Sequence, residues 1–189
     1  MLCVLSTPSQ VVYLGISGVL CPSRSPNDAV VEALPPFNRH KEYEATHVLA
    51  RALEGWPNAR IVLTSTLPWR YGLFSVLSNL GPEVGTKVLG FTYADLTAKA
   101  RLGPRGLPLG NADYWRHTKA EIVRLHVGWM LPDAWIAVDD DTLLWSEEER
   151  RQHFVHVDGR KGLLDPVAQD RLLTKLQGNF GEPRPSARE

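Results

Sequence analysis

Residues 10–20 read Gln-Val-Val-Tyr-Leu-Gly-Ile-Ser-Gly-Val-Leu. The apolar run at residues 11–14 is rich in β-formers, and Gly15 and Gly18 follow closely after it. Such a run predicts a buried strand that ends in a tight loop. Because ligands of open α/β sheets bind at the carboxyl ends of the strands, we expect the chemistry of this protein to lie at this loop.

Apolar runs that predict strands alternate along the chain with segments of helical periodicity. Further strands are predicted at residues 59–63, 87–91, 134–138 and 153–157, and helices at 41–56, 70–80, 114–127 and 165–176. This alternation predicts βαβ units and a mainly parallel sheet with helices on both faces. We assign residues 1–177 to a single domain and expect residues 178–189 to be a disordered tail.

Composition argues against several classes of protein. The chain has 189 residues, of which 43% are hydrophobic, and this suits one globular domain. Lys and Arg number 21, as do Asp and Glu, so the net charge gives no support to nucleic-acid binding. Cys3 and Cys21 are too few for a disulfide framework, and no apolar stretch approaches the roughly 18–20 residues that span a bilayer. The amino terminus lacks the features of a signal peptide, so we expect a cytoplasmic protein without a membrane partner.

The segment at residues 10–20 resembles the first motif of the haloacid dehalogenase (HAD) superfamily, in which four apolar residues precede Asp-x-Asp-Gly-Val/Thr-Leu. Gly15 and Ser17 stand at the positions of the two aspartates. In the family the first aspartate is the nucleophile and a Mg²⁺ ligand, and the second is the general acid and base. Glycine has no side chain for the first role, and a serine hydroxyl titrates too high for the second near neutral pH.

The second and third motifs of the family have counterparts in the expected order. Thr64 or Ser65, after the strand at residues 59–63, resembles the hydroxyl that binds the phosphoryl group, and the sequence does not choose between them. Lys119 resembles the cation that neutralises the phosphoryl charge, with Arg116 as the fallback. Turn hydroxyls and helix lysines are common, so neither residue would indicate a site by itself.

The run Asp139-Asp140-Asp141, which follows the strand at residues 134–138, resembles the fourth motif of the family. The resemblance implies that Asp139 and Asp140 bind Mg²⁺, as hard oxygen ligands do, with an affinity weakened by the loss of the first aspartate. The alternative is an acidic turn in which Asp141 caps the next segment. Residues 157–164 are similar to the stretch that ends many small HAD proteins without a cap domain, some of the Swiss Army Knife RNA repair type.

The resemblance covers about residues 10–177 and implies a Rossmannoid three-layer sandwich with a minimal cap or none and the first strand in the middle. We favour a pseudoenzyme, not a conventional HAD phosphatase, that binds a small phosphorylated ligand or has a regulatory role. Its phosphate-sized pocket would be lined by Gly15, Ser17, Thr64, Ser65, Lys119, Asp139 and Asp140.

Two alternatives remain open. One is an active Mg²⁺-dependent phosphohydrolase, which would use metal-activated water or Ser17 as the nucleophile. The other is a scaffold that binds an unidentified protein partner through residues 22–36 and 92–113, because loops are common contact surfaces.

Overall fold

The computed structural model describes residues 9–21, 43–92 and 116–184. In this part of the chain the sheet consists of β1 (Gln10–Leu14), β2 (Arg60–Leu63), β3 (Val88–Phe91), β4 (Ala134–Asp139) and β5 (Phe154–His156). The order across the sheet is β3-β2-β1-β4-β5, and all neighbouring strands are parallel. The first strand is therefore central, as expected.

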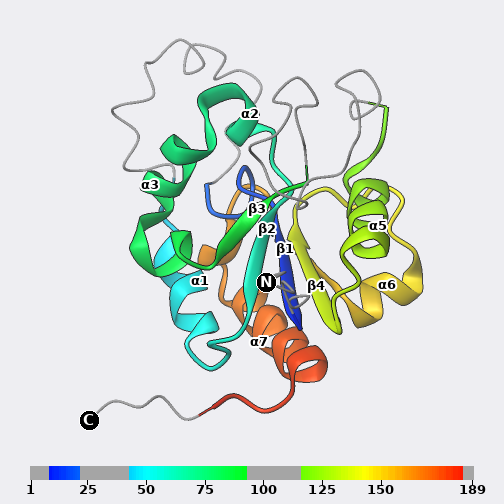
Figure 1. Ribbon diagram of the computed structural model, residues 1–189. Helices are drawn as coiled ribbons and strands as arrows, with labels where there is room; N and C mark the ends of the chain where they lie inside the picture. Colours follow the sequence, from blue (N-terminus) through cyan, green and yellow to red (C-terminus); the bar gives the residue numbers. More distant parts are fainter. Residues whose placement is uncertain (1–8, 22–42, 93–115, 185–189) are drawn as a thin grey trace, which may run out of the picture.

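The helices pack on both faces of the sheet, which makes the molecule a three-layer α/β sandwich (Figure 1). They are α1 (Thr46–Leu53), α2 (Leu67–Tyr71), α3 (Leu73–Gly85), α5 (Lys119–Met130), α6 (Glu147–Gln152) and α7 (Pro166–Phe180), with a 3-10 turn η3 (Gly162–Leu164). Val12 and Leu14 of β1 pack with α1, α3 and α7, whereas Val11 and Tyr13 pack with α5. Successive side chains of a strand point to opposite faces, so a continuous apolar run serves both layers.

The expected helix at residues 70–80 is divided in the structure. Gly72 separates α2 from α3 with a φ of 82°, and Gly81 and Pro82 introduce a kink inside α3. A positive φ is a conformation that glycine adopts without steric strain. The expected irregular segment at 22–36 and nearly all of the loop at 92–113 lie outside the described residues, as does any cap between β1 and α1. Among the helices that the structure describes, none has both the length and the apolar character needed to cross a membrane.

The last helix extends beyond the expected boundary at residue 177. α7 continues to Phe180, whose side chain is buried in the core. The indole Nε1 of Trp56 donates a hydrogen bond of 2.9 Å to the carbonyl of Gly181, and the backbone N–H of Arg184 donates one of 2.8 Å to the carbonyl of Gly55. The structure thus corrects the expected start of the tail, because these contacts hold the chain against α1 and its following turn.

The short helix α6 was not expected from periodicity, since none of its residues is buried. Its sequence signal is a capping box, in which the hydroxyl of Ser146 accepts a hydrogen bond from the backbone N–H of Glu149 and the Glu149 carboxylate accepts one from the N–H of Ser146. Arg124 of α5 donates two hydrogen bonds of 2.6 Å to the same carboxylate. This bidentate pair connects α6 to α5.

Acid is expected to weaken this connection. Hydrogen bonding from Arg124 is the main reason that the pKa of Glu149 falls from 4.5 to about 2. Because the folded-state pKa is depressed, the stabilisation is present above pH 4.5 and is lost as the pH falls through about 2. Solvent screens the half-exposed Arg124, so we expect Glu149→Gln to lower the free energy of unfolding by only about 1 kcal/mol near pH 7.

Urea unfolding of the natural protein and of Glu149→Gln measures this difference, which should shrink towards zero near pH 2. Glu148→Gln is the matched control, since Glu148 lies on the same helix and bonds only to Gln152 among the contacts shown. A difference between Glu149→Gln and the natural protein that does not change with pH would contradict the role given to Arg124.

Candidate functional site

The candidate site lies where β1, β2 and β4 end, towards the top of Figure 1. The residues that follow or close these strands are Gly15, Thr64 and Asp139. Leu14 of β1 stands beside Val138 of β4 in the sheet, and the N–H of Gly15 donates a hydrogen bond of 2.9 Å to the Val138 carbonyl. The register of the apolar strands therefore places Gly15 next to Asp139.

The carboxylate of Asp139 occupies the space in which a side chain at Gly15 would lie. A Cβ atom built on Gly15 would be 2.4 Å from Oδ2 of Asp139 and 2.9 Å from its Cγ. The first of these distances is close to the separation between Cβ and a carboxylate oxygen within a single aspartate. A carboxylate is thus present beside Gly15, but β4 supplies it instead of β1.

Three residues hold the Asp139 carboxylate in this position. Nζ of Lys119 donates hydrogen bonds to Oδ1 at 2.8 Å and to Oδ2 at 2.9 Å. The hydroxyl of Thr64 donates to Oδ2 at 3.3 Å, and the backbone N–H of Asp141 donates to Oδ1 at 3.0 Å. Asp139 is only 3% exposed, so this buried charge is compensated by an ion pair and by hydrogen bonds.

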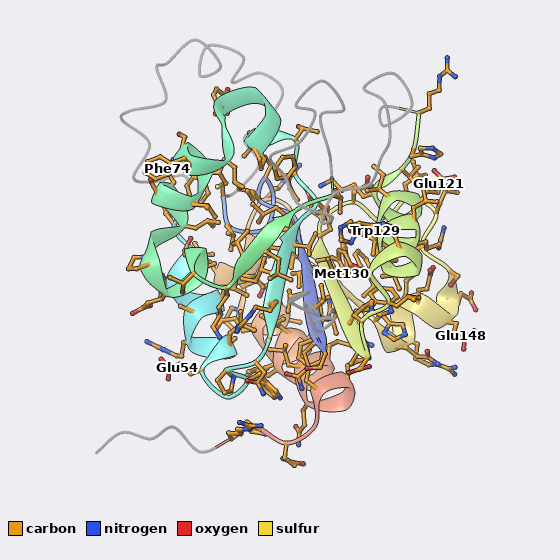
Figure 2. All side chains as sticks on the ribbon, viewed as in Figure 1. Glu54, Phe74, Glu121, Trp129, Met130 and Glu148 are labelled. Atoms are coloured by element: carbon orange, nitrogen blue, oxygen red, sulfur yellow. The ribbon has the colours of Figure 1, made fainter. Side chains whose placement is uncertain are left out.

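A capping box fixes the place of Lys119. The hydroxyl of Thr118 accepts a hydrogen bond of 3.3 Å from the N–H of Glu121, and the Glu121 carboxylate accepts one of 2.8 Å from the N–H of Thr118. Helix α5 therefore begins at Lys119, and Figure 2 shows Glu121 in its first turn. The start of the helix places Lys119 at the end of β4, although this lysine precedes Asp139 by 20 positions in the sequence.

Asp140 takes the space beside the second glycine of the loop. Gly18 has a φ of 72°, and a Cβ atom on it would lie 2.2 Å from Oδ2 of Asp140. Burial, and then the neighbouring Asp139 carboxylate, raise the pKa of Asp140 to about 6, although Lys119 acts in the opposite direction. The two adjacent carboxyl groups therefore lie in different environments, one paired with an ammonium and the other desolvated against a glycine.

The two candidate hydroxyls of the second motif have different partners. Thr64 faces Asp139, whereas Oγ of Ser65 accepts a hydrogen bond of 3.2 Å from the N–H of Leu67 at the start of α2. Of the two, the structure brings Thr64 to Lys119 and Asp139. Ser65 shapes the turn into α2, as serine does after many strands.

Other candidate residues lie outside this cluster. Ser17 is exposed and forms an isolated β-bridge with Cys21. Arg116 is exposed ahead of α5. Asp141 uses Oδ1 to accept a hydrogen bond of 2.9 Å from the N–H of Leu143, so its side chain stabilises the acidic turn, which was the alternative considered for it.

One supporting residue was missed in the sequence. Gly162 has a φ of 58°, and a Cβ atom on it would lie 2.3 Å from the carbonyl oxygen of Val19. The adjacent N–H of Leu163 donates a hydrogen bond of 2.9 Å to the same oxygen. The Gly-Leu pair thus supports the loop after β1, and its occurrence in the stretch at residues 157–164 was the available signal.

A comparison with protein families identifies the family and the fold of the chain. A family model described as the HAD domain in Swiss Army Knife RNA repair proteins matches residues 11–168. The chain belongs to this family. The match runs from β1 into α7, and the parallel sheet with β1 at its centre is the HAD-like Rossmannoid fold. Comparisons with curated proteins and with solved structures gave no match.

The residues at the centre of this HAD domain do not fit the Mg²⁺ ion that the family resemblance implies. Mg²⁺ requires a near-octahedral shell of oxygen ligands at about 2.0–2.1 Å. Both oxygens of Asp139 accept hydrogen bonds from Lys119, and Gly15 has no carboxylate to offer. Within residues 9–21, 43–92 and 116–184, no three His, Cys, Asp or Glu side chains form a group that could hold a metal. The arrangement gives no support to the metal-binding role expected of Asp139 and Asp140.

Proposed function

We propose that this HAD domain binds a phosphorylated ligand and does not transfer its phosphoryl group through an aspartyl intermediate. The observation that supports the proposal is the position of Asp139, whose carboxylate fills the place beside Gly15 where the family has its nucleophile. A carboxylate nucleophile needs an oxygen lone pair directed at the phosphorus atom. In Asp139 the two oxygens together accept four hydrogen bonds and are almost inaccessible to solvent.

A cationic donor at this sheet edge supports the binding of an anionic group. The side chain of Lys119 remains 29% exposed, so its ammonium can contact a ligand while it is paired with Asp139. The Thr64 hydroxyl at the end of β2 donates its proton to Asp139 and is buried, so it acts by holding this carboxylate beside Lys119. Charged donors form the stronger hydrogen bonds to phosphate oxygens. The zero net charge of the chain adds no argument for RNA as that ligand.

Phosphate-ester hydrolysis is the second candidate function, and the feature that favours it is the closeness of the Asp139 carboxylate to position 15. Asp139 would attack the phosphorus atom to form an aspartyl phosphate while the ester oxygen leaves with a proton from Asp140. A water molecule deprotonated by Asp140 would then hydrolyse the aspartyl phosphate and release inorganic phosphate. This mechanism requires Lys119 and Thr64 to release Asp139 when the substrate binds. Turnover by the natural protein that disappears in Asp139→Asn would therefore favour hydrolysis over binding.

Restoring both first-motif aspartates should create turnover. In the variant Gly15→Asp with Ser17→Asp, the new side chain at position 15 would displace the Asp139 carboxylate, which is the end of a flexible side chain. Gly15 is not among the residues with positive φ, so the backbone accepts an aspartate there. Since a nucleophile contributes on the order of 10⁶ in rate, we expect Mg²⁺-dependent hydrolysis of a simple phosphomonoester at least about 100-fold above that of the natural protein.

The controls for this assay are Gly15→Asp alone and Asp139→Asn alone. The single Gly15→Asp variant lacks the general acid and should remain much slower than the double variant. Phosphate binding by the natural protein is measured in parallel, by a shift of the melting temperature with inorganic phosphate. Phosphate that stabilises the natural protein less than it stabilises a Thr64→Val, Lys119→Met variant would contradict the binding proposal.

A further inference from the structure

We propose that the ammonium group of Lys119 is the counter-cation of Asp139 in the natural protein and excludes divalent metal ions from this site as long as position 15 carries no carboxylate. The inference concerns the metal dependence of the site, and it does not depend on which ligand the protein binds. It rests on the disagreement between the Mg²⁺ that the family resemblance implies and the donor set that the structure shows.

The ammonium of Lys119 contacts both oxygens of Asp139, and the Asp139 side chain is the buried partner of this pair. Nζ lies 2.8 Å from Oδ1 and 2.9 Å from Oδ2, so one cation neutralises both oxygens. The Asp139 side chain is 4% exposed. A divalent ion bound to either oxygen would lie within a few ångströms of the ammonium, and two cations at such a distance repel each other strongly in a poorly solvated site.

The neighbouring groups keep the ammonium in place. The capping box between Thr118 and Glu121 fixes the first turn of α5, which carries Lys119. Of the other acids near Asp139, Asp140 lies against Gly18 and also interacts with Asp139 and Lys119, whereas Asp141 accepts a hydrogen bond from Leu143. With no side chain at Gly15, the carboxylate of Asp139 turns into the vacated space, and there it meets Lys119 and Thr64.

Metal binding by the natural protein and two lysine variants tests the inference. The probe is Mn²⁺ alone, titrated against the full chain and followed by electron paramagnetic resonance, with competition by Mg²⁺. We expect the natural protein to bind Mn²⁺ with a dissociation constant of about 1 mM or more, which is far weaker binding than that of a dedicated metal site. Lys119→Met should bind Mn²⁺ at least roughly tenfold more tightly, because the competing positive charge is removed from both Asp139 oxygens, although Thr64 and the N–H of Asp141 still donate to them.

The conservative variant Lys119→Arg is the matched control and should bind Mn²⁺ as weakly as the natural protein, because it keeps the positive charge. Adding Asp139→Asn to Lys119→Met should abolish the gain, which would locate the ion at Asp139. Equal Mn²⁺ affinity in Lys119→Met and the natural protein would overturn the inference. If Lys119→Met does not fold, the natural protein provides the test. A dissociation constant for Mn²⁺ well below about 1 mM that rises in Asp139→Asn overturns the inference, and a dissociation constant of about 1 mM or more upholds it.

Discussion

Replacing Gly162 by alanine is expected to lower the free energy of unfolding by about 3 kcal/mol or more. The residue has a φ of 58°, and a Cβ atom there would lie 2.3 Å from the carbonyl oxygen and 3.1 Å from the carbonyl carbon of Val19. These are backbone atoms, which cannot rotate away as a side chain can. The loop after β1 would have to move, and the hydrogen bond from Leu163 to Val19 would be lost with it.

Gly178→Ala is the matched control for this substitution. Gly178 lies inside α7, is exposed, and has no atom within 4 Å of the position of an added Cβ. Alanine favours a helix interior over glycine by up to about 1 kcal/mol, so this variant should be as stable as the natural protein or more stable. Urea unfolding of both variants gives the comparison. Similar stabilities for Gly162→Ala and Gly178→Ala would contradict the close approach at Val19.

Substitutions at the two adjacent aspartates are expected to change stability in opposite directions near neutral pH. Asp139→Asn removes the negative charge that faces Lys119 and weakens the hydrogen bonds from Thr64 and from the N–H of Asp141. The site is 3% exposed, and a buried pair that loses one partner is strongly destabilised. Because Lys119 can still reach solvent, we expect a loss of about 2 kcal/mol.

Asp140→Asn should stabilise the protein near pH 7. Burial and the charge of Asp139 raise the pKa of Asp140 from 3.8 to about 6. The folded state therefore favours the protonated form, so the ionised carboxylate destabilises the fold above about pH 6 and has no such effect below 3.8. After allowing for the solvent-exposed part of the group, we expect a gain of about 1 kcal/mol near neutral pH, which disappears in acid.

The measurement is urea unfolding of both asparagine variants near pH 7 and again below pH 4. The expected result is a loss for Asp139→Asn and a gain for Asp140→Asn at the higher pH. Equal losses at pH 7 would mean that the two carboxylates share one environment, and this would contradict the geometry at Gly15 and Gly18.

Much of the fold could be predicted because its strands are apolar on both faces. The runs at residues 11–14 and 134–138 indicated buried strands of a mainly parallel sheet, and the structure places them side by side as β1 and β4. Lys119 could be selected because it stands between the second strand and the acidic run, and the Thr118-x-x-Glu121 box that starts its helix is visible in the sequence. The family match over residues 11–168 confirms the resemblance that these motifs suggested.

The rest depended on packing between distant residues. α6 was missed because it buries no side chain and carries only a capping signal. The end of α7 was placed too early because the two prolines and mixed charge of residues 178–189 indicated a tail from Gly178 onward, yet the ring of Phe180 packs in the core. The position of the Asp139 side chain could not be predicted at all, since it is decided by the space at Gly15 on another strand and by the reach of Lys119.

The shared space at Gly15 and Asp139 also has an evolutionary consequence. A side chain at position 15 and the present rotamer of Asp139 exclude each other, because a Cβ atom at 15 would lie 2.4 Å from Oδ2. Substitutions at residues in direct contact are seldom additive. A single substitution that introduces an aspartate at position 15 would therefore disrupt the existing ion pair before both acids of the first motif were present. The effects of substitutions at positions 15 and 139 should thus depend on each other, so that the two sites constrain each other's sequence changes.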